Sequence, residues 1–307
     1  MSLAFHVYHP GAKAIFDVTS TLVTGEKDAF LVDAQFQKQY AEELVQLIKN
    51  SGKELKVIYI SHFDPDYYFG LDVLADAFPK ARILSTAQTA WMISASRDDK
   101  LVVWKKALGE DAPSRFILPE AVKELPKLEG EEIRIITCPD DEMHSFLYVP
   151  SEKTVLGGVS LAEDSHPWMA DTKGLDEMDK WIRQVETMAS LAPEKVIASH
   201  HYNDEKKGHP AILSCTLEYL KYYREALASG KTADAIVSMM SEKYPSLGGK
   251  DTLAFGARVI TGVEPWVRKD LYPGIGHHVI MDFSPAAVFD VEFKDHKTLS
   301  FTQTEGE

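Results

Sequence analysis

A histidine, two aspartates and a tyrosine follow a short apolar run in the segment VIYISHFDPDYYFG, residues 57–70. Where a strand ends in a tight loop, alternate side chains lie on the same side, so His62 and Asp64 can converge on one ion. Asp66 and Tyr67 enter the next helix, close enough to reach a neighbouring position. Histidine and carboxylate ligands without a thiolate suit Zn, Fe or Mn rather than a structural cysteine site.

The same loop has a simpler interpretation as the start of a helix. Aspartate is a common N-terminal cap, because its carboxylate accepts hydrogen bonds from the free amides of the first turn. Asp66 alone therefore fits a cap as well as a functional group. Only a second set of donors from other parts of the chain would separate the two interpretations.

Strands and helices alternate along the segment that must position these residues. Two β-rich blocks are each followed by helix–strand alternation, which predicts two packed sheets with helices outside, an αββα sandwich of α/β (α+β) class. The expected strands are 14–25, 28–36, 55–62, 81–86, 132–141, 145–150, 153–161 and 194–201. The expected helices are 37–52, 67–79, 86–109 and 175–193.

The chain changes character after His209. Helical spacing predicts helices over 214–230, 232–245 and 253–262, and the expected strands are 277–283, 286–293 and 297–304. We therefore expect a sandwich domain over 1–209 and a C-terminal extension of helices and short strands over 210–307, packed on it. The apolar strands of this extension could pair with the edge of another copy, which makes a homo-oligomer possible.

Composition and charge narrow the classes of partner. The 307 residues carry a net charge of −14, which argues against a nucleic-acid or anionic-membrane surface and leaves a small molecule as the expected partner. Cys138 and Cys215 show neither disulfide nor metal-type spacing, which indicates a reducing environment. With no secretion signal at the start and no apolar run of about 20 residues, we expect a cytoplasmic protein.

The opening segment resembles the metallo-β-lactamase-fold hydrolases. Their hallmark is a strand-end Thr/Ser-His-x-His-x-Asp-His followed by a glycine, and Ser61 to Tyr67, with Gly70, aligns with it without a gap. Three later segments align, in the same order along the chain, with three further motifs of the family. These motifs are a Gly-His-Thr type loop, a strand ending in Gly-Asp and a strand ending in Gly-His. These segments are CPDDEMHSFLYVP, KTVLGGVSL and VIASHHYND. The resemblance covers residues 14–201 and implies the αββα fold.

The resemblance also implies a ligand set, with departures from the family pattern. The first-site ligands would be His62, Asp64 and Asp141, with His144 as a substitute for the last. The second-site ligands would be Asp66, Tyr67 in place of a histidine, and His200.

Val159 aligns with the aspartate that bridges two metals in the family, and a valine cannot coordinate. The expectation is therefore a mononuclear or otherwise atypical site, since six donors remain for one divalent ion. They are His62, Asp64, Asp66, Asp141, His144 and His200. An aspartate in place of a histidine at position 64 shifts the preference toward Fe(II), Mn(II) or a weakly held Zn.

The resemblance implies hydrolysis of a small ester, lactone or thioester by a metal-bound hydroxide. Asp66 would orient the nucleophile or shuttle its proton, and Tyr67 would stabilise the oxyanion. Two alternatives remain open. The first is a metal-free pseudoenzyme or small-molecule-binding protein on the same fold. The second is a mononuclear iron oxidoreductase, with His62, Asp64 and His200 as a two-histidine, one-carboxylate triad.

Overall fold

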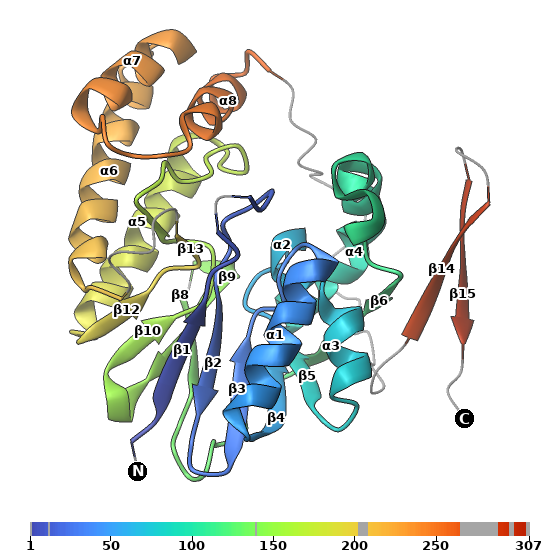
Figure 1. The fold of residues 1–307 in the computed structure, drawn as a ribbon. Coiled ribbons are helices and arrows are strands. Elements are labelled where there is room, and N and C mark those ends of the chain that lie inside the picture. The colour runs from blue at the N-terminus through green and yellow to red at the C-terminus, as the bar shows by residue number, and fades with distance from the viewer. Residues whose placement is uncertain are drawn as a thin grey trace.

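Two β-sheets pack face to face, and helices cover both outer faces of the resulting sandwich (Figure 1). The structure is a computed structural model that describes residues 2–11, 13–138, 140–201, 208–264, 288–294 and 298–304. The α1, α3 and α4 helices cover one face, and α5 and α6 cover the other. The expected αββα architecture is therefore confirmed.

The first sheet has six strands in the order β1-β2-β3-β4-β5-β7. The first three strands pair antiparallel and the following ones parallel. Their bounds are β1 (Ala4–Tyr8), β2 (Ser20–Thr24), β3 (Asp28–Val32), β4 (Glu54–Tyr59), β5 (Arg82–Ser85) and β7 (Glu120–Ala121).

The second sheet has the order β12-β10-β9-β8, and only its β10–β12 pair is parallel. Its strands are β8 (Arg134–Cys138), β9 (Asp141–Val149), β10 (Thr154–Leu156) and β12 (Lys195–Ile197). Shorter pairings join β11 (Ala162–Glu163) to β13 (His200–His201), and β6 (Arg115–Ile117) to the hairpin of β14 (Val288–Lys294) and β15 (Thr298–Thr304).

The helices are α1 (Lys38–Ser51), α2 (Pro65–Tyr68), α3 (Leu71–Ala77), α4 (Ala87–Leu108), α5 (Gly174–Ser190), α6 (Ala211–Ala228), α7 (Ala233–Lys243) and α8 (Lys250–Ile260). Two short 3₁₀ turns, Gly109–Asp111 and Pro150–Glu152, complete the elements. No described helix combines the length and the apolar character that crossing a membrane requires.

Strand alternation divides the apolar residues of β3 between two cores. Phe30 and Val32 lie in the core between the sheets, whereas Ala29 and Leu31 lie in the core under the outer helices. This follows from the two-residue period of a strand, which sends neighbouring side chains to opposite faces. Both faces of β3 are thus buried, so its register in the sheet is fixed.

Three expected elements differ from the structure in a way that matters for the site. The helix expected over 67–79 is interrupted at Gly70, which separates α2 from α3. The strand expected over 194–201 is divided into β12 and β13. The strand expected from residue 145 begins at 141 and forms β9, so Asp141 and His144 lie in a strand rather than in a preceding loop.

The helices after residue 210 continue one of the cores of the sandwich. Tyr219 of α6, Ile236 of α7 and Leu253 of α8 share a buried cluster with Phe146 of β9 and Val155 of β10. Of the strands expected near the end of the chain, the last two are present as β14 and β15, and 277–283 lies outside the described residues. The expected domain boundary at residue 209 stays a prediction.

Candidate active site

Asp33 anchors the motif loop, residues 61–70, to the end of β3. Its backbone is left-handed, with φ 65°, a conformation that aspartate tolerates better than most residues. One carboxylate oxygen accepts from the Ser61 amide at 2.8 Å and the other from the Ser61 hydroxyl at 2.7 Å. Burial raises the pKa of Asp33 from 3.8 to about 7, although the hydrogen bonds from Ser61 oppose the rise.

Ser61 also ties the loop that follows β10 into the site. The Ser61 hydroxyl accepts from the Gly158 amide at 2.8 Å. A Cβ atom on Gly158 would lie 2.4 Å from the carbonyl oxygen of Ser145, and its φ is +77°, so only glycine fits here. The segments that contain Asp33, Ser61 and Gly158 are far apart in the sequence and are thereby held together at one edge of the sandwich.

Gly70, the last residue of the motif, allows α2 to pack directly on the turn after β3. Its amide donates to the Gln35 carbonyl at 2.9 Å, and a Cβ atom here would lie 2.2 Å from the Ala34 carbonyl oxygen and 2.6 Å from the Ala41 Cβ. Backbone cannot yield as a flexible side chain can. We expect Gly70→Ala to lower the free energy of unfolding by about 3 kcal/mol, measured by urea denaturation.

Gly52→Ala is the matched control for this prediction. Gly52 has φ +67° but nothing within 4 Å of its Cβ position, so the substitution should cost only the conformational penalty, about 1 kcal/mol. If Gly70→Ala costs no more than Gly52→Ala, the close packing at residue 70 has no energetic importance.

His62 is buried, with 3% of its surface exposed, and only one of its ring nitrogens has a partner. Nδ1 accepts from the Asp64 amide at 3.2 Å and lies 3.4 Å from the Asp64 carboxylate. Burial lowers the pKa of His62, which favours the neutral ring. We assign its proton to Nε2, because an amide N–H can only donate and therefore needs a lone pair on Nδ1.

Asp64 is paired with a lysine from α4. The Lys100 ammonium donates to the Asp64 carboxylate at 2.9 Å and to the Phe63 carbonyl at 2.7 Å, and it lies 4.8 Å from the centroid of the Phe63 ring. Burial would raise the pKa of Asp64, but the Lys100 ammonium outweighs it and holds that pKa well below its usual range. Asp64 is therefore an anion that already has its own cation.

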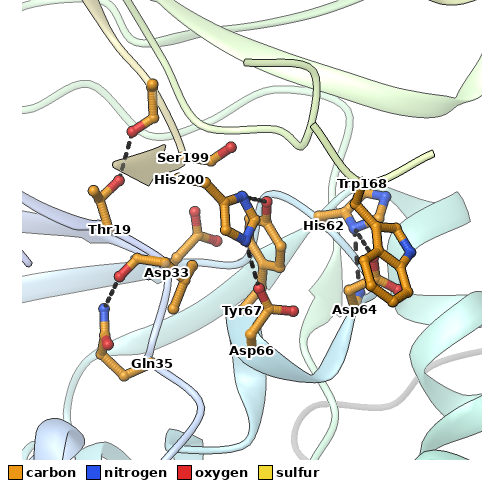
Figure 2. Close-up of polar contacts among 12 residues, drawn as sticks. Thr19, Asp33, Gln35, His62, Asp64, Asp66, Tyr67, Trp168, Ser199 and His200 are labelled. Carbon is orange, nitrogen blue, oxygen red and sulfur yellow. Dashed lines mark hydrogen bonds and ion pairs between the residues drawn. The ribbon is translucent and has the colours of Figure 1, made fainter. Parts of the chain in front are cut away.

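Asp66, His200 and Tyr67 form a second closed group, at the centre of Figure 2. His200 Nε2 lies 3.0 Å from an Asp66 carboxylate oxygen, and Nδ1 lies 3.4 Å from the Tyr67 hydroxyl. Tyr67 in turn donates to the Gly158 carbonyl at 3.4 Å. Burial opposes the charged ring, but the bond to Asp66 outweighs it and raises the pKa of His200. Both ring nitrogens are therefore engaged.

Asp141 and His144 form a third pair, near the start of β9. Both carboxylate oxygens lie 2.9 Å from His144 Nδ1, so this nitrogen carries the proton and donates it. Burial opposes ionisation of Asp141, yet the bond from His144 holds its pKa below the usual value. His144 Nε2 has no hydrogen-bond partner among the described residues, and the side chain is 33% exposed.

His144 faces His62 across the site. The two rings are nearly parallel, with an interplanar angle of 10°, and their centroids are 5.6 Å apart. The Tyr67 ring lies edge-on to the His62 ring, with the two ring centroids 5.2 Å apart, and also lines the site. Two neighbouring imidazole rings thus each have one nitrogen without a hydrogen-bond partner among the described residues, His62 Nε2 and His144 Nε2.

The residues present do not fit a metal site as they are arranged. Within the described parts of the chain, no group of three or more His, Cys, Asp or Glu side chains is placed to hold an ion. Each predicted carboxylate donor is paired with another side chain, as Asp64–Lys100, Asp66–His200 and Asp141–His144. Val159, at the bridging position, packs against the apolar core. The six-ligand set stays a prediction that this geometry does not support.

Lys100 was not among the residues that the sequence indicated. It lies on α4, 36 residues after Asp64, and a lysine on a helix of mixed composition carries no local signal. Asp33 falls within the strand expected over 28–36, where an acid fits a turn or a strand end, so its place in the site was not predicted. The role of Asp33 became visible only through its bonds to Ser61.

Comparison with known proteins gives a family. The family described as "Metallo-beta-lactamase superfamily" matches residues 15–200. Among curated proteins, the chain is similar to the uncharacterized protein YobT of Bacillus subtilis (strain 168), with 31% identity over 116 residues. That match covers 37% of this chain and 46% of YobT, so it spans about half of the relative's length.

Solved structures give the same fold. The chain is similar to a metallo-beta-lactamase family protein from Thermus thermophilus, with a TM-score of 0.57, 18% identity, and 84% of this chain and 91% of that chain covered. It is also similar to a metallo-beta-lactamase from Pontibacter korlensis, with a TM-score of 0.51, 18% identity, and 71% and 94% covered. At this identity the likeness establishes a shared fold and nothing about substrate.

Proposed function

Because the chain belongs to the metallo-beta-lactamase superfamily, we propose that it is a hydrolase-type enzyme acting on a small ester, lactone or thioester. One observation carries the proposal. His144 Nδ1 is held by the buried Asp141 carboxylate, so that Nε2 is left free opposite His62. A histidine fixed in this way by a carboxylate is a general base in many unrelated hydrolases.

The chemistry follows from the two free ring nitrogens. His144 Nε2 takes a proton from a water molecule, and the resulting hydroxide adds to the substrate carbonyl. Asp141 stabilises the imidazolium that forms. The His62 Nε2–H donates to the oxyanion of the tetrahedral intermediate, which a buried donor stabilises more strongly than water does. His144 then returns the proton to the leaving alcohol or thiol as the carbonyl re-forms.

The predicted catalytic roles of Asp66 and Tyr67 are not part of this proposal. Both groups are bonded to His200. We assign Asp66 and Tyr67 a structural role in holding the motif loop. The predicted iron triad of His62, Asp64 and His200 is set aside for the same reason, since both nitrogens of His200 are engaged.

A second candidate is a protein that binds a small molecule without turning it over. The observation that favours it is the pairing of every predicted carboxylate donor with another side chain, which leaves few groups for chemistry. Binding in that case would depend on the same two imidazole rings. The two candidates differ in whether a carbonyl substrate is cleaved.

A panel of model substrates tests the proposal. The full chain, treated with EDTA and desalted, is assayed with p-nitrophenyl acetate, an acyl thioester and a γ-lactone at neutral pH. We expect catalytic turnover of at least one of them, unchanged by EDTA, because the base and the oxyanion donor are both side chains. Turnover that disappears with EDTA and returns with added metal would contradict this mechanism. Binding of the compounds without turnover would favour the second candidate.

A further inference from the structure

We propose that the Lys100 ammonium takes the place of a metal cation at the motif loop, so that the centre does not take up a divalent ion while Lys100 is present. This inference goes beyond the proposed hydrolysis and does not depend on it, because metal content is measured without any substrate. It concerns the disagreement between the family's metal chemistry and the donors that this chain brings together.

The surroundings of Lys100 are those of a bound cation. Its Nζ contacts one carboxylate oxygen, of Asp64, and one carbonyl oxygen, of Phe63, and lies over the face of the Phe63 ring. The side chains of Lys100 and Asp64 are each only 21% exposed, so the pair is shielded from most of the solvent. A charge-assisted bond of this kind is stronger than a surface ion pair.

The helix that carries Lys100 is firmly positioned. The α4 helix begins at a Thr86 cap, whose hydroxyl accepts from the Thr89 amide, and its neighbouring residue Leu101 is buried in the core. Lys100 therefore reaches the motif loop from a helix that packs on the core. An incoming ion would have to displace this ammonium from a fixed position before Asp64 could become a ligand.

The charges of the side chains in the centre give an independent reason to expect no divalent ion there. A divalent ion is normally held where carboxylates have no other cation to neutralise them. Here Asp64 already has the Lys100 ammonium beside it, and the other carboxylates of the centre are engaged in hydrogen bonds, Asp33 with Ser61, Asp66 with His200 and Asp141 with His144. Without Lys100, Asp64 would be left as a partly buried anion beside His62, with His144 close by.

Metal uptake by Lys100→Met tests the inference. Wild-type protein purified without chelator, then incubated with Zn, Mn or Fe(II) and desalted, should contain far less than one ion per chain by elemental analysis. Methionine keeps the length of the stem and removes the charge, which frees Asp64. We expect Lys100→Met to retain up to about one ion per chain and to gain thermal stability when metal is added.

Lys106→Met on the same helix is the matched control, because Lys106 is exposed and should leave metal content unchanged. Lys100→Arg keeps the positive charge and should also remain without metal, and Lys100→Gln replaces Lys100→Met if the latter does not fold. Wild-type protein with close to one tightly held ion would overturn the inference. So would a folded Lys100→Met or Lys100→Gln variant that takes up no more metal than the wild type. Neither result depends on whether any ester is cleaved.

Discussion

Substitution of His144 by glutamine should lower kcat/KM for the cleaved substrate about 100- to 10,000-fold, the range that general-base catalysis contributes. Glutamine has no ring nitrogen to take the proton from water, whereas its amide can still donate to Asp141. The side chain is 33% exposed, so the thermal unfolding temperature should change little. Steady-state kinetics on the substrate identified in the panel, together with circular dichroism melting, measures both effects.

His6→Gln is the control for this substitution, since His6 is exposed on the edge strand β1 and belongs to no part of the site. It should retain the wild-type rate. Asp141→Asn gives a second readout, because a residue that positions the base should change kcat and leave KM nearly unaltered. A folded His144→Gln variant with wild-type activity would exclude His144 as the base and leave the binding-protein alternative.

Stability should depend on pH through Asp33. Its pKa is raised from 3.8 in the unfolded chain to about 7 in the folded one, so the folded state holds the proton more tightly. The contribution of Asp33 is therefore fully present below pH 4 and is lost as the pH rises through 7. This difference in pKa corresponds to a loss of about 4 kcal/mol of unfolding free energy.

Asp33→Asn removes the titration while keeping a side chain that tolerates the left-handed backbone and can bond to Ser61. We expect the unfolding free energy of Asp33→Asn, relative to wild type, to increase between pH 4 and pH 8 by about 4 kcal/mol in urea titrations. For Asp234→Asn, an exposed position on α7, the unfolding free energy relative to wild type should change little between pH 4 and pH 8. A relative stability of Asp33→Asn that is flat across this range would show that Asp33 is ionised throughout.

The sequence determined the fold because its signals are local and repeated. Runs of β-branched residues, such as those of β4, and helical spacing of apolar residues, such as that of α1, each depend on neighbours a few positions away. The ordered set of segments around the motif then indicated the family, and the family match over residues 15–200 confirmed it. Boundaries were less accurate where glycine or a short loop interrupts an element, as at Gly70.

The tertiary structure decided which partner each polar side chain has. The family resemblance had already placed His200 with Asp66, 134 residues away, whereas Lys100 meets Asp64 from 36 residues away and no spacing rule could have paired those two. Residue types alone made Asp64 a candidate ligand, but the folded chain places an ammonium against it. Hydrogen bonds and ion pairs between distant segments depend on where packing puts each atom, and a list of donors does not contain that information. The sequence thus determined which groups the centre contains, and the fold decided which of them remain free to react.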